Sequence, residues 1–131
     1  MYEKADPDYK GSYSVPALWD RKKKTIVNND SVGIMRMLST AFDEFLDPAL
    51  REVNKLGGGL RPEKLAKEID ELGGRIELDY NWGTYMCGMA QSQADYDESM
   101  KRLFGLLGEL EERLGGSRFL FGDHITETDI R

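Results

Sequence analysis

Two short segments carry residue types that could bind a small peptide. In the first, Pro16 lies inside residues 14–19 (SVPALW), a stretch that otherwise favours a strand. A proline within a strand removes a hydrogen-bond donor, so it needs an explanation. A cis Val15–Pro16 bond would turn the N–H and C=O of Val15 outward, where they can pair with a passing peptide. The alternative is an edge strand with a trans proline, and since only about one X–Pro bond in twenty is cis, this segment alone decides little.

The second segment, residues 28–31 (NNDS), directly precedes a helix pattern. Taken alone, Asp or Ser here is best interpreted as ordinary N-capping. Free N–H groups and the positive end of the helix dipole also favour an anion. Ser31 could hold a carboxylate while Asp30 holds an ammonium group, and a γ-glutamyl end carries both on one carbon. The two segments together suit glutathione, with its peptide against Val15.

Short strands and a helix must position these residues. We predict strands at 14–19 and 25–29 around a polar turn at 20–24, and a helix from Ser31 that continues to Phe45. Asp47-Pro48 should end that helix, because a residue before proline is pushed out of helical geometry. The glycines at 57–59 indicate a flexible linker.

The remainder predicts helices. Pro62 suits a first helical position, and one apolar face follows it, although Gly73-Gly74 leave open whether that helix ends or bends. Ser92 and Asp95 form a capping box for a helix that Gly115-Gly116 should stop. Its predicted apolar side comprises Tyr96, Met100, Leu103, Phe104, Leu107, Leu110 and Leu114.

The last residues carry another helix start signal. Thr126 and Asp129 form a second capping box, with Ile125 and Ile130 placed for a hydrophobic staple. A cap without a helix body favours truncation over a frayed tail. A chain cut in this way would leave strand edges and helix faces uncovered, so we expect it to be only marginally stable.

Composition excludes several classes. The net charge of −6 and the pI near 4.9 argue against a general nucleic-acid binder, and the basic run 21–24 fits a solvated hairpin tip. No apolar run is long enough to span a bilayer. A single cysteine, Cys87, fits a reducing compartment, so we expect a cytoplasmic protein. No residues show metal-ligand spacing.

Residues 15–20, 25–31 and 34–38 together resemble the second half of the thioredoxin domain of glutathione transferases. Three further stretches make the sequence most similar to the glutathionyl-hydroquinone reductases, or Xi-class transferases: Tyr9-Lys10-Gly11, residues 85–90 (YMCGMA), and residues 119–123 running into 126–131. The resemblance covers nearly the whole chain, and the segment beginning at Tyr85 is what narrows it.

The resemblance implies an α+β fold in pieces. Residues 1–47 would be the last two strands and helix of a thioredoxin-like domain, 48–61 a linker, and 62–131 the first helices of an all-α domain. Glutathione, the co-substrate, would be bound by Ser12, Tyr13, Ser14, Val15, Asp30 and Ser31, with Pro16 as the structural cis-proline. No metal is implied.

The implied activity is reduction of glutathionyl-hydroquinones. A cysteine in a Cys-Pro-Trp-Ala motif upstream of Met1 would attack the thioether sulfur, and Tyr85 would assist proton transfer beside the substrate. The resemblance also implies a homodimer when complete, with no nucleic acid or membrane partner. These 131 residues alone would then be inactive.

Three positions depart from the family pattern. Ser12 stands where an arginine is usual, Asp30 where a glutamate is usual, and Gly73-Gly74 replace ordinary helix formers. The first two put glutathione affinity in question. Cys87 is best interpreted as a buried structural residue, and His124 as a loop residue.

Two alternatives to the enzyme remain. The chain could be a non-catalytic transferase-like module for binding or assembly, or an inactive truncated product. An upstream Cys-Pro-Trp-Ala motif would favour the enzyme over the module.

Overall fold

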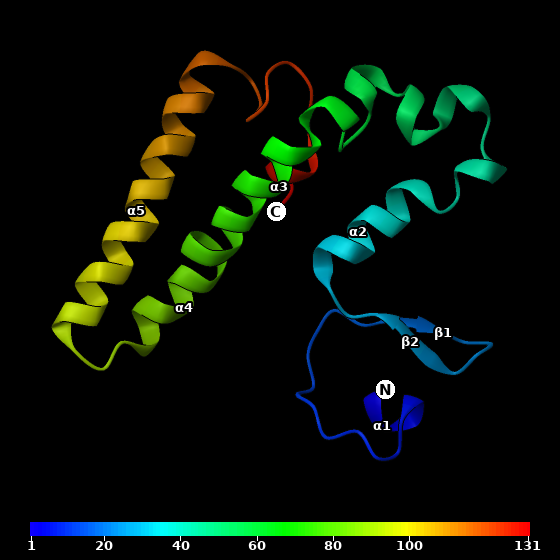
Figure 1. Cartoon of the computed structure of the whole chain (residues 1–131), viewed down its shortest axis with the longest axis horizontal. Helices are drawn as coiled ribbons and strands as arrows, with labels where there is room; N and C mark the ends of the chain where they lie inside the picture. Colours follow the sequence, from blue (N-terminus) through cyan, green and yellow to red (C-terminus); the bar gives the residue numbers. More distant parts are fainter. The chain divides into compact units, whose positions relative to one another are not determined.

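A computed structural model describes all of residues 1–131, which divide into two compact units, Met1–Arg51 and Glu52–Arg131. The boundary between the units falls inside the predicted linker 48–61. The first unit holds the only two strands and two α-helices, and the second is helical (Figure 1). The α+β fold class predicted from the sequence is therefore confirmed.

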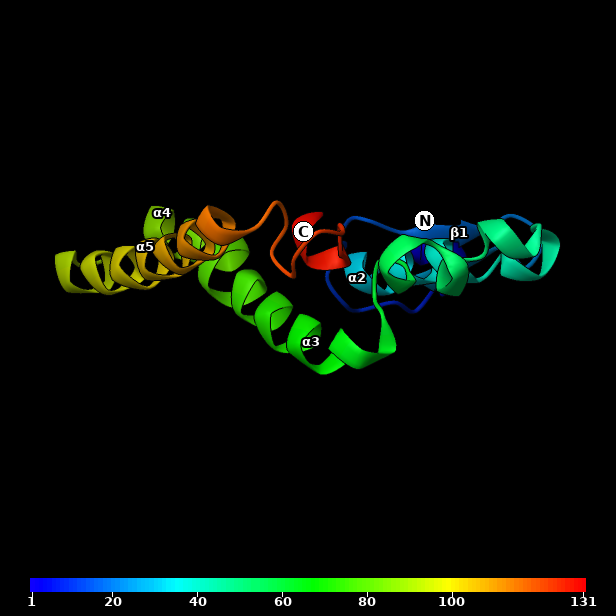
Figure 2. The same ribbon diagram turned by 90° about the horizontal axis from the view of Figure 1, so that it is seen from above.

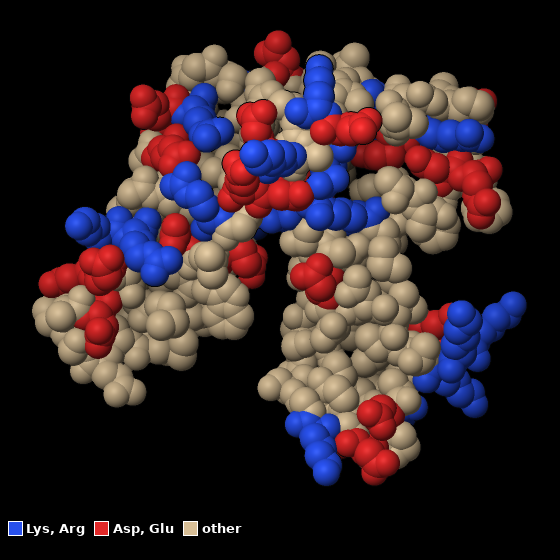
Figure 3. Space-filling view, in the orientation of Figure 1, with Lys and Arg blue, Asp and Glu red and all other residues tan.

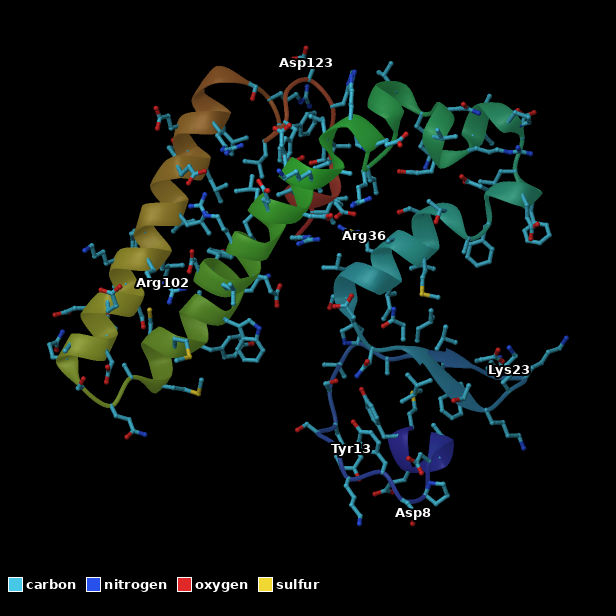
Figure 4. The ribbon with its side chains drawn as sticks, viewed as in Figure 1. Asp8, Tyr13, Lys23, Arg36, Arg102 and Asp123 are labelled. Atoms are coloured by element: carbon cyan, nitrogen blue, oxygen red, sulfur yellow. The ribbon has the colours of Figure 1, made fainter.

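The strands form an antiparallel hairpin. β1 (Leu18–Asp20) pairs with β2 (Thr25–Asn28), with an irregularity between Leu18 and Trp19. The turn is closed by Asp20, whose Oδ1 accepts the N–H groups of Lys22 and Lys23, both at 2.8 Å. Figure 4 shows Lys23 pointing away from this tip, as the solvated basic run predicts.

The first strand is shorter than predicted, because residues 14–17 are not part of the sheet. Pro16 has no N–H to offer, and Ser14 is hydrogen-bonded to Tyr2 instead of to β2. A short helix, α1 (Tyr2–Ala5), contacts β2. The sequence did not predict this helix.

α2 (Ser31–Thr40) starts where predicted but ends early, so the predicted extension to Phe45 is wrong. The hydroxyls of Ser39 and Thr40 donate to the carbonyls four residues back, at 2.9 and 3.1 Å, which weakens the last turn. Phe45 lies in a 3₁₀ turn (Asp43–Phe45) and is 76% exposed. Its ring is therefore not buried, and no packing of this residue favours extending the helix to it.

The helical unit is a pair of long antiparallel segments (Figures 1 and 2). α3 (Ala66–Arg75), a π-helical turn (Ile76–Asn81) and α4 (Trp82–Met89) follow one another without leaving helical geometry. α5 (Gln93–Gly116) lies beside α4 and ends at the predicted glycines. None of these helices combines the length and the hydropathy that a bilayer-spanning segment requires.

Pro62 is not the first helical residue, because it precedes a separate 3₁₀ turn (Glu63–Leu65) with extended ψ. The helix neither ends nor breaks at Gly73-Gly74. Gly73 is buried, and a Cβ there would overlap the guanidinium of Arg131, whereas Gly74 faces open space. The close approach of Arg131 therefore explains why position 73 is a glycine.

A small core joins α3 to α5. Leu72, Ile76 and Leu106 are its buried members, with Leu110, Leu120 and Phe121 packed against them. The predicted apolar side of α5 is only partly right. Leu106, absent from that prediction, is 2% exposed, while Phe104 is 59% exposed. The elements beside α5, chiefly α4 and the π-helical turn, thus cover a narrower stripe of α5 than its apolar residues form.

Ion pairs flank this core. Arg75 contacts both carboxylate oxygens of Glu109, at 3.0 and 2.6 Å, and so ties α3 to α5. Arg102 of α5 (Figure 4) pairs with Asp79 of the π-helical turn. Hydrogen bonds and charge from Arg75, then Arg113, hold the pKa of Glu109 below its usual range, although partial burial opposes the shift.

The capping box at the end of the chain is confirmed. Asp129 Oδ2 accepts the N–H of Thr126 at 2.8 Å, and its Oδ1 accepts the N–H of Leu120 at 2.8 Å. The box opens a 3₁₀ turn (Glu127–Asp129). The predicted staple does not bury its residues, since Ile125 and Ile130 are 45% and 51% exposed.

Residues 52–60, inside the predicted linker, contain two 3₁₀ turns, Glu52–Asn54 and Leu56–Gly58, that are held by hydrogen bonds. Glu52, 7% exposed, accepts hydrogen bonds from the N–H of Leu60 and from Lys55. Gly57, Gly58 and Gly59 all have φ between 78° and 89°, and a Cβ on Gly59 would overlap Glu52. The carbonyl of Leu60 in turn accepts the N–H of Glu127 at 2.8 Å.

The two glycines of α3 should respond oppositely to alanine. Gly74→Ala should raise the free energy of unfolding by about 0.5–1 kcal/mol, because it removes glycine's backbone entropy at an open site. Gly73→Ala should lower it by about 1–3 kcal/mol, because the added methyl meets Arg131. Urea unfolding followed by circular dichroism measures both, and a gain in stability for Gly73→Ala would contradict the packing described.

The Arg75–Glu109 pair should make stability depend on pH. A lowered pKa means that the contribution of Glu109 is present above the ordinary glutamate value near 4.3 and is lost as pH falls through the lower folded value. Glu109→Gln should therefore cost about 0.5–1 kcal/mol at pH 6, and less at pH 3. Glu112→Gln, on the same helix without an ion pair to Arg75, is the control. A cost independent of pH would contradict the assignment.

Candidate functional site

The Val15–Pro16 bond is cis, as predicted. Val15 is 92% exposed, and neither its backbone N–H nor its carbonyl is hydrogen-bonded within the chain. An outward-facing backbone donor and acceptor are therefore available at this residue, which is the arrangement that an extended peptide needs.

The start of α2 is capped by Asp30. Its Oδ2 accepts the N–H of Gly33 at 2.5 Å, and its own N–H donates to Asn28 Oδ1 at 2.8 Å. The cap satisfies one helix N–H and leaves those of Ser31 and Val32 without an acceptor in the chain. Capping and anion binding, alternatives on sequence grounds, can thus coexist here.

A buried tyrosine joins the two segments. The Tyr2 hydroxyl donates to the Ser14 carbonyl at 2.9 Å, and Asn29 Nδ2 donates to Tyr2 Oη at 3.2 Å and to Ser14 Oγ at 3.4 Å. We call these three side chains the Tyr2 junction. It brings the residue before Val15 into contact with the residue before Asp30. The hydrogen bonds from Ser14 and Asn29 lower the pKa of Tyr2.

Sequence reasoning missed Tyr2 and Asn29. The available signal was the spacing of Tyr2, Tyr9 and Tyr13, whose rings form a cluster with centroids 4.9 to 5.8 Å apart. Such clustering of tyrosines close in sequence predicts a local aromatic core.

The other predicted binding residues lie on the loop before Val15. The carbonyl of Ser12 accepts the Tyr9 hydroxyl at 2.9 Å. The Tyr13 hydroxyl donates to Glu3 at 2.8 Å, and this contact raises the pKa of Tyr13 (Figure 4). Ser12, which is exposed, offers a hydroxyl where the resemblance implies a charge.

Tyr85 belongs to the second unit, on α4. It is 64% exposed, and its ring centroid lies 5.9 Å from that of Trp82. Cys87, on the same helix, is only half-buried, so its prediction as a buried structural residue is wrong. His124 is exposed, and its ring closely approaches Gly57. No group of three or more His, Cys, Asp and Glu side chains is placed to hold a metal ion.

Comparisons with known proteins agree on one superfamily. Residues 93–131 match the family described as "Glutathione S-transferase, C-terminal domain". Over its full length the chain is 44% identical to glutathionyl-hydroquinone reductase YqjG of Escherichia coli, and 40% identical to glutathionyl-hydroquinone reductase PcpF of Sphingobium chlorophenolicum. It covers 38% and 39% of those proteins, so it spans about two fifths of their length.

Solved structures give the same result. The chain superposes on glutathione transferase Xi 1 from Trametes versicolor with a TM-score of 0.86 and 40% identity, covering 98% of this chain and 42% of that one. Against the glutathione-bound structure of YqjG the TM-score is 0.85 with 43% identity, covering 98% of this chain and 39% of that one.

Fold and comparisons together define the class: the chain has the fold of part of a glutathione transferase, a thioredoxin-like piece followed by a helical piece. Within that superfamily it is similar, over its full length, to the glutathionyl-hydroquinone reductases and Xi-class transferases.

The Tyr2 junction should control both stability and ligand binding. Tyr2→Phe removes the hydroxyl and leaves the Ser14 carbonyl and Asn29 amide unpaired, which should lower the free energy of unfolding by about 1–3 kcal/mol and weaken glutathione binding. Tyr9→Phe, which loses only a hydrogen bond within an exposed loop, is the matched control. Thermal unfolding and glutathione calorimetry on both variants test this, and equal effects would contradict the special role of Tyr2.

Proposed function

We propose that this chain is the glutathione-binding corner and part of the substrate domain of a glutathione-dependent reductase acting on glutathionyl-hydroquinones. The observation that carries the proposal is the Tyr2 junction, which links the outward backbone of Val15 to the open start of α2. The full-length similarity to two glutathionyl-hydroquinone reductases supports the substrate class. A homodimer, implied by the resemblance, and a cytoplasmic location, expected from the single cysteine, belong to the same proposal.

Glutathione would bind in two parts. The backbone N–H and C=O of Val15 pair with the cysteinyl peptide. The γ-glutamyl carboxylate accepts hydrogen bonds from the Ser31 hydroxyl and from the free N–H groups at the start of α2, where the helix dipole favours an anion. The γ-glutamyl ammonium pairs with Asp30, whose Oδ1 is not used by the helix cap.

The reaction would be a two-step exchange at sulfur. A cysteine thiolate from outside these residues attacks the sulfur of the glutathionyl-hydroquinone, forming an enzyme–glutathione disulfide as the carbon–sulfur bond breaks. The released ring carbon takes a proton, and we propose that Tyr85 assists this proton transfer. A second glutathione then attacks the disulfide, yielding oxidised glutathione and free thiolate. The sum converts one conjugate and one glutathione into one hydroquinone and one glutathione disulfide.

Tyr85 is suited to a donor role. Its phenolic hydroxyl can donate a hydrogen bond to the leaving ring. Cys87 has no part in the proposed reaction. Cys87 is half-buried on α4, two residues before the last residue of that helix, so it lacks the helix N-terminus that could activate a thiolate.

Two substitutions should separate binding from chemistry in the complete protein. Ser31→Ala removes a hydrogen bond to a charged carboxylate, worth about 1.5–3 kcal/mol, and should mainly raise the glutathione requirement. Tyr85→Phe removes only the hydroxyl beside the leaving ring, and should mainly lower kcat, by on the order of 100-fold. Steady-state kinetics with both substrates varied measures each effect.

Two controls complete this test. Cys87→Ser should keep full activity, and these 131 residues alone should show no turnover. Loss of activity in Cys87→Ser with an upstream cysteine dispensable would overturn the roles assigned. Glutathione binding by a complete protein without any reductase activity would instead favour the non-catalytic module.

A further inference from the structure

An exposed aromatic pair opens α4. Trp82 and Tyr85 are 55% and 64% exposed, with ring centroids 5.9 Å apart and planes at 51°. The indole N–H of Trp82 and the hydroxyl of Tyr85 have no hydrogen-bond partner in the chain. Two large rings with unused polar ends are therefore presented side by side, an arrangement suited to a ligand that is both aromatic and hydroxylated.

The pair lies within a longer uncharged strip. Leu78, Trp82, Tyr85, Met86 and Met89 recur at helical spacing, and each is at least 52% exposed. In Figure 3 the surface over the lower end of the helical unit, where α4 lies, is mostly free of Lys, Arg, Asp and Glu. Charged side chains gather elsewhere on the face shown, so this strip differs from its surroundings.

The backbone before the pair is also unusual. Ile76–Asn81 forms a π-helical turn, and the N–H of Trp82 bonds to the carbonyl of Glu77, five residues back. Such turns are rare and occur frequently at functional sites. Arg102 of α5 pairs with Asp79 of this turn, and within the turn the Asn81 amide donates to Glu77 at 2.9 Å. A held π-helical turn sets the direction in which Trp82 leaves the helix.

We propose that Trp82 is a specificity-determining residue that binds the aromatic ring of the conjugate against Tyr85. This inference rests on the proposed function and deepens it. The ring lies on the indole face, while a hydroxyl of the hydroquinone accepts from or donates to Tyr85. The substrate class is thus S-aryl glutathione conjugates with hydroxyl groups on the ring. Trp82 positions the ring and takes no proton or electron pair.

Kinetics of the complete protein on two substrates test the role of Trp82. The first substrate is S-(2,5-dihydroxyphenyl)glutathione, and the second is the mixed disulfide of glutathione with 2-mercaptoethanol, which has no ring. Trp82→Leu should raise KM for the aryl conjugate roughly three- to tenfold, with a smaller change in kcat. Trp82→Phe should restore most of the loss, and the aliphatic substrate should be unaffected.

Phe104→Leu is the matched control, since Phe104 is 59% exposed and belongs to α5 instead of α4. It should leave both KM values unchanged. An unchanged aryl KM in Trp82→Leu, or an equal rise for both substrates, would overturn the inference while leaving the proposed function intact. Circular dichroism of each variant confirms folding, which an exposed residue should not disturb.

Failure of the proposed function is a separate outcome. If the wild-type complete protein does not reduce the aryl conjugate, calorimetry still decides the role of Trp82. The wild type should bind S-(2,5-dihydroxyphenyl)glutathione more tightly than S-methylglutathione, and Trp82→Leu should lose that preference. The same preference in both proteins would overturn the inference.

Discussion

The first unit depends on one hydroxyl group. Tyr2 is the only buried residue between Met1 and Arg51, at 8% exposure, and its hydroxyl holds Ser14 and Asn29 together. A hairpin of this size buries too little apolar surface to be stable by itself. The hydrogen bonds of Tyr2 therefore fix the loop that carries Val15 against the corner that carries Asp30, and the glutathione site inherits its geometry from them.

The helical unit is organised differently, around buried charge beside a small apolar core. Glu127, 1% exposed, accepts from Arg131 at 3.2 Å while its N–H bonds to Leu60. Arg131 lies against Gly73, whose missing side chain makes room for the guanidinium. An ion pair this buried is expensive to break because each partner would be left uncompensated. It therefore ties the end of the chain to α3 and to the turn at residue 60.

Local signals made much of this predictable. The N-cap at Ser92 and the capping box at Thr126 follow from short patterns of neighbouring residues, although at Ser92 only the cap side chain accepts a backbone N–H. The cis Val15–Pro16 bond is predicted from two segments taken together, since the proline segment alone decides little. The end of α2 and the buried face of α5 depend on tertiary packing, and the local sequence does not indicate which elements pack against them. The Tyr2 junction joins residues 27 apart, so no window along the chain could reveal it.

Asp30 shows how the cap and the ligand site share one side chain. Aspartate is among the best N-cap residues, whereas the glutamate implied by the resemblance is not a preferred cap. Here one carboxylate oxygen accepts the N–H of Gly33, and the other takes no part in that cap. The side chain of Asp30 is shorter than that of glutamate and extends less far toward the γ-glutamyl ammonium. Its position is fixed, however, by the hydrogen bond to the helix. A pre-oriented carboxylate loses less conformational freedom on binding, which offsets part of the lost reach.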